Sequence, residues 1–85
     1  MNAGAYGPIH EVSAEELKIF KKAMHGLVGV NYEPETVATQ VVKGTNYKYI
    51  CNATVVAPDA KTFKAEVIIY MPLQGDPVIF EIKRL

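Results

Sequence analysis

Residues 13–26, SAEELKIFKKAMHG, carry the clearest helical pattern of the chain. It opens with a capping box, in which the Ser13 hydroxyl accepts the N–H of Glu16 and the Glu16 carboxylate accepts the N–H of Ser13. Apolar residues then recur at helical spacing, and lysines occupy the other side. The apolar stripe comprises Leu17, Phe20, Met24 and Leu27. We therefore predict one amphipathic helix over residues 13–26, closed by Gly26 and Gly29.

After this helix, the apolar residues alternate with a period of two, which is typical of β-strands. The expected strands are residues 35–42, 46–56, 62–71 and 78–84. The segments between them, residues 43–44, 57–60 and 72–77, are rich in turn-forming Gly, Pro and Asp. Residues 31–34 are expected to connect the helix to the first strand.

Consecutive strands with short links pair antiparallel, and the apolar face of the sheet needs a cover. The helix is the only cover that the pattern offers. The sequence thus predicts one domain, residues 1–85, with an α+β fold in which one helix packs across a twisted antiparallel sheet of four to five strands. The fifth strand is the N-terminal arm, residues 1–12. The expected core is Leu17, Phe20, Met24, Val67, Ile69, Phe80 and Ile82.

Composition narrows the range of partners and compartments. The 85 residues carry a formal net charge of zero, which argues against a nucleic-acid partner because phosphate contacts need a basic surface. The longest apolar run, residues 67–71, is too short to cross a bilayer, and no signal peptide is visible at the start. We expect a cytoplasmic protein without a membrane partner.

The chain has few side chains from which a catalytic or metal site is built. Its two histidines, His10 and His25, are not spaced to pair with the single cysteine, Cys51, or with carboxylates. Cys51 lies mid-strand on the expected core face, which favours a structural cysteine over a nucleophile. No phosphate-binding glycine motif is present. We expect no enzyme activity, no cofactor and no metal.

The most informative segment is QVVKG, residues 40–44. It fits an ordinary hairpin turn in which Gly44 supplies a permissive backbone. However, the β-branched Val41 and Val42 run up to the turn, which suggests local strain, and strain often marks function. On these grounds alone, a plain turn and a functional loop remain equally open.

The same segment resembles the Gln-x-Val-x-Gly signature of the cystatins, and Thr45-Asn46-Tyr47 extends the match. The whole chain is similar in element order to the stefins, the disulfide-free, intracellular cystatins. Gly4 stands where stefins keep an N-terminal glycine. The segment Met71-Pro72-Leu73-Gln74-Gly75 stands where they have a second hairpin loop.

This resemblance implies a reversible, tight-binding inhibitor of papain-like cysteine proteases. In the family, the arm and two hairpin loops form an apolar wedge that blocks the active-site cleft. The residues that the resemblance assigns to protease binding are Gly4, Gln40, Val41, Val42, Lys43, Gly44, Pro72 and Leu73. Among them, Val42 and Leu73 are the expected apolar anchors, and Lys43 is expected to point to solvent.

Two other functions stay open at this stage. The first alternative to the inhibitor is a cystatin-fold module that binds another protein through the same loops. The second is a small enzyme that uses Cys51 or a histidine. The protein is expected to be a monomer that also forms a domain-swapped dimer, if the turn at residues 42–44 straightens as a strained hinge.

Overall fold

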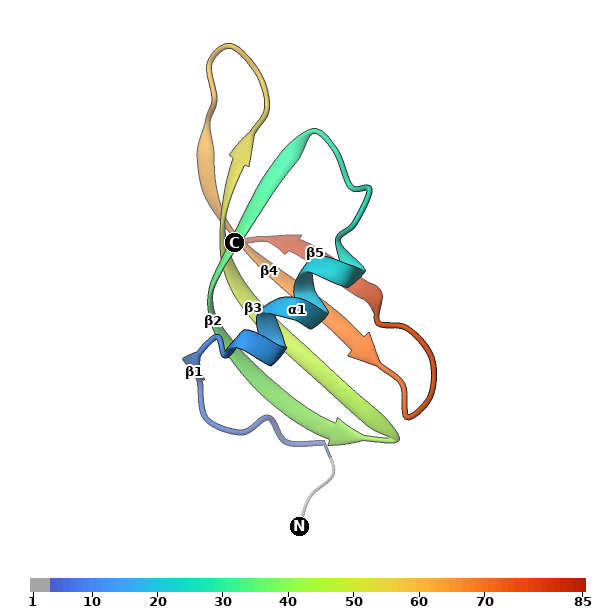
Figure 1. Ribbon diagram of the computed structural model, residues 1–85. Helices are drawn as coiled ribbons and strands as arrows, with labels where there is room; N and C mark the ends of the chain where they lie inside the picture. The colour runs from blue at the N-terminus through green and yellow to red at the C-terminus, as the bar shows by residue number, and fades with distance from the viewer. Residues whose placement is uncertain (1–3) are drawn as a thin grey trace.

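The computed structural model describes residues 4–85, so the first three residues of the predicted arm lie outside the described part. Its elements are β1 (His10–Glu11), α1 (Ala14–Ala23), β2 (Val30–Val42), β3 (Gly44–Val55), β4 (Thr62–Met71) and β5 (Val78–Arg84). The five strands form one sheet in sequence order, and every neighbouring pair is antiparallel. Helix α1 lies across this sheet (Figure 1). The predicted α+β fold is confirmed, with the arm contributing the short strand β1.

The capping box forms as predicted. The Ser13 hydroxyl accepts the Glu16 N–H at 3.1 Å, and the Glu16 carboxylate accepts the Ser13 N–H at 2.9 Å. The helix ends at its C-cap Met24, and Gly26 follows with a positive φ of +86°. With ten residues, α1 is shorter than predicted. Leu27 lies beyond its end and is exposed.

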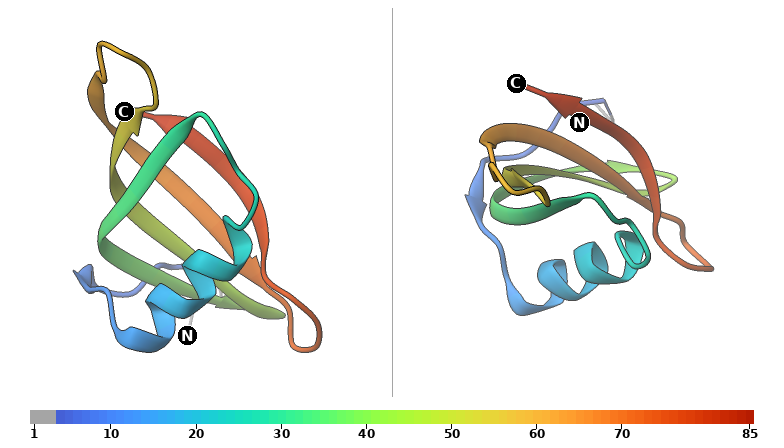
Figure 2. Two further views of the ribbon diagram at one scale, coloured as in Figure 1. Left: turned by 45° about the horizontal axis from the view of Figure 1, so that its top comes forward. Right: turned by 90° about the horizontal axis from the view of Figure 1, so that it is seen from above.

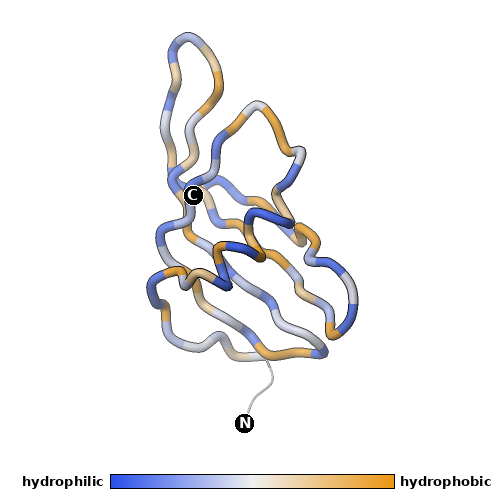
Figure 3. The backbone as a smooth tube through the Cα atoms, in the orientation of Figure 1, coloured by the Kyte–Doolittle hydropathy of each residue, from blue (hydrophilic) through white to orange (hydrophobic). Residues whose placement is uncertain are grey.

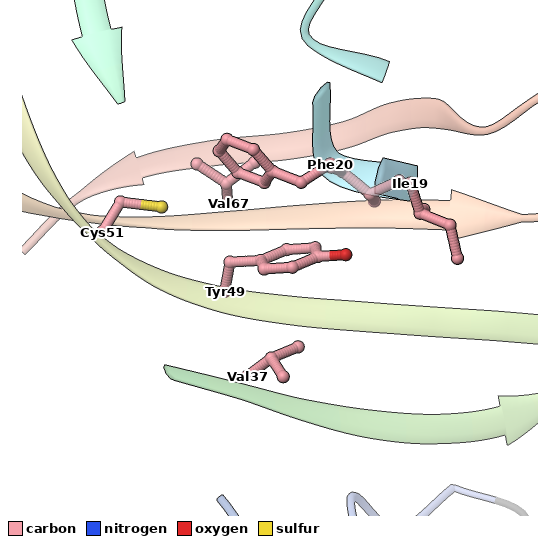
Figure 4. Packing of buried hydrophobic residues seen from close by; sticks show 7 residues of the cluster. Ile19, Phe20, Val37, Tyr49, Cys51 and Val67 are labelled. Carbon is pink, nitrogen blue, oxygen red and sulfur yellow. The ribbon is translucent and has the colours of Figure 1, made fainter. Parts of the chain in front are cut away.

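The core lies between α1 and the centre of the sheet (Figure 4). The ring of Phe20 meets that of Tyr49 edge-on, with centroids 4.8 Å apart, and the Tyr49 hydroxyl donates to the Glu16 carbonyl at 2.7 Å. The predicted core residues Phe20, Val67 and Ile69 are buried, whereas Leu17 and Met24 are half-buried. Further buried members are Ile19, Val37, Tyr49 and Cys51.

Strand β2 is longer than the sequence suggested. Residues 31–34 belong to this strand and pair with residues 51–54 of β3, so their assignment as a connection was wrong. The register shifts between Pro34 and Thr36. Proline cannot donate a hydrogen bond to a strand ladder, so Pro34 favoured a connection in the sequence. It is tolerated in β2 because it lies at this irregularity.

Phe80 and Ile82 of β5 were wrongly predicted as core residues, because Phe80 is 71% exposed and Ile82 36% exposed. Ile82 pairs with the buried Val67 and lies on the predicted face, but at the edge of the sheet. The ladder between β4 and β5 is irregular at Ile68/Ile69, where Ile69 pairs with Ile79 but Ile68 pairs with Glu81. Phe80 is thus the extra residue, and Val78 moves to the face of its partner Tyr70. In addition, α1 packs over β3 and β4 and leaves the β5 edge uncovered (Figure 2).

The arm and the helix lie on opposite faces of the sheet. Figure 2 shows the arm passing behind the sheet, turning round its edge at β1 and leading into α1 in front. No helix within residues 4–85 is long and apolar enough to span a membrane.

Candidate functional site

Antiparallel topology brings the three predicted binding segments to one end of the molecule. The hairpin between β2 and β3 and the loop between β4 and β5 turn at the same end of the sheet, since Thr45 pairs with Met71. The side chain of Gln40 reaches the arm at Gly4, to whose carbonyl it donates at 2.6 Å. Figure 3 shows a hydrophobic stretch running into the hairpin tip at this end. We call residues Gly4, 40–44 and 72–73 the loop end.

The first hairpin turns tightly around Gly44. Val42 pairs directly with Gly44, whose φ is +102°. A Cβ at this position would lie 2.5 Å from the Met71 carbonyl oxygen and 3.0 Å from the Tyr70 hydroxyl oxygen, so only glycine fits. No other residue type within 4–85 has a positive φ. The strain expected at Val41 and Val42 is therefore not observed, because Gly44 adopts the unusual conformation.

A row of polar side chains holds the hairpin and the arm together. Gln40, Asn46 and Tyr70 occupy neighbouring positions on three adjacent strands. The Asn46 amide donates to the Gln40 side-chain oxygen at 2.7 Å, which orients Gln40 toward the Gly4 carbonyl. The Tyr70 hydroxyl donates to the Lys43 carbonyl at the tip.

Asn46 and Tyr70 were not assigned to the site from the sequence. In the sequence, Asn46 belongs to the Thr-Asn-Tyr extension of the cystatin-like motif. Its place opposite Gln40 follows from counting back from the hairpin turn, because residues at equal distance from a tight turn face each other. Tyr70 has no comparable local signal, since its contact with the tip depends on the register between β3 and β4.

The rest of the arm is attached to the sheet by few contacts. The Gly7 N–H donates to the Thr39 carbonyl at 2.8 Å, and the Lys48 ammonium lies 3.9 Å from the centroid of the Tyr6 ring. A cavity of about 330 Å³ remains between the arm and the sheet, lined by Tyr6, Ile9, Lys48 and Glu66 among others. The polar contacts at Gly4 and Gly7 therefore set the course of the arm.

The second loop is positioned from the helix side. Its Asp76 carboxylate forms an ion pair with the Lys22 ammonium of α1 at 2.9 Å. Gly75 turns the chain with a φ of +113°, and Pro72 lies beside it. Leu73 is left 74% exposed. An ion pair between exposed groups contributes little stability, so this contact holds the loop beside α1 only weakly.

The loop end carries exposed apolar side chains and few charged ones. Val41 is 57% exposed and Val42 39%, and Leu73 is also at the surface, while Lys43 is the one charged residue among these predicted binding residues. Within residues 4–85, no three His, Cys, Asp or Glu side chains gather as a metal site. The loop end is therefore suited to bind an apolar surface of a partner.

The residues considered for chemistry lie elsewhere. Burial, with a smaller contribution from Glu35, raises the pKa of the Cys51 thiol to about 12, so it stays protonated at neutral pH. His10 lies between two acceptors, the Glu16 carboxylate at 2.8 Å and the Pro8 carbonyl at 3.1 Å. The hydrogen bond with Glu16, followed by that with Pro8, raises the pKa of His10. Both residues thus have structural contacts that account for their positions.

Comparison with protein-family models, with curated proteins and with solved structures finds no match to this chain.

Proposed function

We propose that this protein is a reversible inhibitor of papain-like cysteine proteases that acts like a stefin-type cystatin. The observation that supports it best is the convergence of Gly4, the hairpin tip and Pro72–Leu73 at one end of a stiff sheet, with Val41, Val42 and Leu73 exposed. These are the segments that the resemblance to cystatins assigns to the protease-binding wedge.

The contacts at the loop end favour binding because they fix its shape in advance. Gln40 connects the arm to the hairpin, and Tyr70 holds the hairpin tip. Little conformational entropy is then lost when the surface docks, so more of the apolar burial appears as affinity. In the proposed complex, Val42 and Leu73 enter the cleft as apolar anchors, and Lys43 stays in solvent.

In the proposed mechanism, inhibition is reversible. The side chains of the loop end offer no electrophile that the catalytic thiolate of the protease could attack, so no stable covalent bond to the protease forms. Gly4 lets the arm approach the catalytic cysteine and turn away, which keeps the chain intact. The fold does not depend on disulfides, because Cys51 is the only cysteine and is buried. A reducing compartment such as the cytoplasm is the proposed place of action.

The test is a titration of papain with the purified monomer, in which we expect near-stoichiometric, reversible loss of activity and recovery of intact inhibitor. Replacing Val42 by aspartate buries an unpaired carboxylate in an apolar cleft and is expected to weaken inhibition more than about 100-fold. The matched control on the next residue, Lys43→Ala, is expected to change it less than about threefold. Removal of residues 1–4 is expected to speed dissociation.

If the folded monomer at tens of micromolar leaves papain and related proteases fully active, the proposal fails. The loop end would then belong to a cystatin-fold module that binds a different protein. Equal inhibition by Val42→Asp and the unmodified chain would show that the hairpin tip does not enter the cleft.

A further inference from the structure

We propose that the outer edge of β5 is a self-association surface on which β5 of a second copy pairs antiparallel. β5 is the last strand of the sheet, and within residues 4–85 no strand pairs with its outer side. Apolar side chains on this strand and directly after it are at the surface, with Phe80 71%, Val78 53% and the following Leu85 58% exposed. Such an edge offers unpaired backbone groups next to apolar surface, which is a template for another strand.

Some backbone N–H and C=O groups of β5 point away from β4, toward the open edge of the sheet. Leu85, which follows the strand, donates its N–H to the carbonyl of Lys64 in β4 at 3.0 Å. Inward and outward groups alternate along an antiparallel strand, so Lys83 and Glu81 also face β4. Ile82 and Arg84 accordingly direct their N–H and C=O groups to the open edge. Two copies related by a two-fold axis at Ile82 can exchange these hydrogen bonds.

The side chains favour this same register. Pairing about Ile82 sets Glu81 opposite Lys83 of the second copy, and the two-fold axis repeats that ion pair. It also brings the exposed ring of Phe80 opposite Arg84 of the second copy. An axis at Glu81 would oppose two carboxylates, and an axis at Lys83 two ammonium groups. Charges on an edge strand normally discourage pairing, but the order Glu-Ile-Lys is complementary to its own copy.

Two further features suit a second copy as the occupant. The chain has no net charge, so two copies do not repel each other at long range. Antiparallel pairing of β5 also points the loop ends of the two copies in opposite directions. Both loop ends therefore stay accessible, in contrast to a domain-swapped dimer, which straightens the first hairpin.

The experiment is sedimentation equilibrium of the full chain over a concentration series at low salt. We expect a rapid monomer–dimer equilibrium with a Kd of about 10–100 µM, because one strand edge is smaller than a standard interface. Glu81→Lys and Lys83→Glu each replace two ion pairs by two repulsions and are expected to weaken dimerisation at least about tenfold. The combined variant, Glu81→Lys with Lys83→Glu, restores opposite charges and is expected to recover the dimer.

Mixing the two single variants supplies a second control, since one then carries two lysines and the other two glutamates at these positions. We expect a heterodimer where neither variant dimerises alone, with far-UV circular dichroism unchanged throughout because both side chains are exposed. The proposal is overturned if the chain stays monomeric to about 1 mM, or if Glu81→Lys dimerises as well as the unmodified chain. A dimer that forms only after heating and ignores both variants is a swapped one and also overturns it.

Discussion

Strand β3 passes through two environments that differ in what they contribute. The side chains at its centre have no exposed surface: Tyr49, Cys51 and Ala53. Tyr49 and Cys51 belong to the core cluster that includes Ile19 and Phe20 of α1. At the start of β3, Gly44 is buried, and the Asn46 side chain donates to Gln40, which in turn donates to the arm, while the nearby Val41 and Val42 are exposed. The centre is apolar and closed, whereas the loop end is polar within and apolar outside.

Stability and recognition are therefore separable along one strand. Burial of apolar side chains at the centre contributes most of the folding free energy in so small a domain. The hydrogen bonds at the loop end mainly fix a shape, because each contributes only about 0.5–1.5 kcal/mol net. Substitutions at the two places are therefore expected to affect different measurements.

The largest effect is expected at the centre. Phe20→Ala removes a ring that is 3% exposed and packs edge-on against Tyr49, so it leaves a cavity in the core. We expect the free energy of unfolding to fall by about 3–5 kcal/mol, measured by urea denaturation. Lys21→Ala, on the exposed side of the same helix, is the control and is expected to be nearly neutral. A loss below about 1 kcal/mol for Phe20→Ala would contradict the packing of α1 on this sheet.

The next effect tests whether the hairpin tip is as tightly constrained as the centre. Gly44→Ala places a Cβ against the Met71 carbonyl at a φ of +102°, and we expect about 1–3 kcal/mol of destabilisation. Gly26→Ala is the matched control, because its φ is +86° but nothing lies within 4 Å of the added Cβ. It measures the cost of the backbone conformation alone. Equal losses for the two variants would show that the contact with Met71 does not exist.

A smaller effect is expected where the arm joins the hairpin. Gln40→Ala removes the donor to the Gly4 carbonyl and the acceptor of Asn46, at a cost of about 0.5–1.5 kcal/mol. We expect a larger relative change in the arm, seen as faster amide exchange of Gly7, whose N–H donates to the adjacent Thr39 carbonyl. The control is Gln74→Ala, at an exposed glutamine of the second loop. If the amide exchange of Gly7 is unchanged in Gln40→Ala, Gln40 does not hold the arm on the sheet.

The smallest effect concerns the join between the arm and α1. Because the hydrogen bonds with Glu16 and Pro8 raise the pKa of His10, its protonated form stabilises the folded state. This contribution is complete below the unfolded pKa of about 6.5 and disappears as the pH rises through the higher folded pKa. A histidine NMR titration is expected to show the raised value. Glu16→Gln keeps the capping box but removes the charge, and is expected to lower it. An unchanged pKa of His10 in Glu16→Gln would rule out the hydrogen bond between His10 and Glu16.

Local signals in the sequence were sufficient for several elements. The helix start followed from the capping box at Ser13, and the bounds of β4 and β5 agree with the predicted residues 62–71 and 78–84. Alternation along β3 and β4 also placed Cys51, Val67 and Ile69 on the core face, as observed. These features depend on neighbours within a few residues, so the pattern alone contains them.

The resemblance to cystatins implied which residues meet at the loop end, and an antiparallel meander places its alternate turns at the same end. Neither indicated which contacts hold these residues together. The contact between Gln40 and Gly4 joins residues 36 positions apart, and the contact of Tyr70 with Lys43 spans 27. Such contacts depend on the register between strands and on the course of the arm across the sheet.

Capping, periodicity and turn chemistry act locally, so the residue pattern alone was sufficient for the kind and order of the elements. The positions at which regular pairing is broken depend on how the strands meet in the folded sheet. The shift at Pro34/Thr36 extends β2 into a segment that looked like a connection, and the shift at Ile68/Ile69 exposes Phe80 and turns Val78 to the other face. A ladder shifted by one residue reverses the faces of a strand without changing its local pattern, so only the paired strand reveals it.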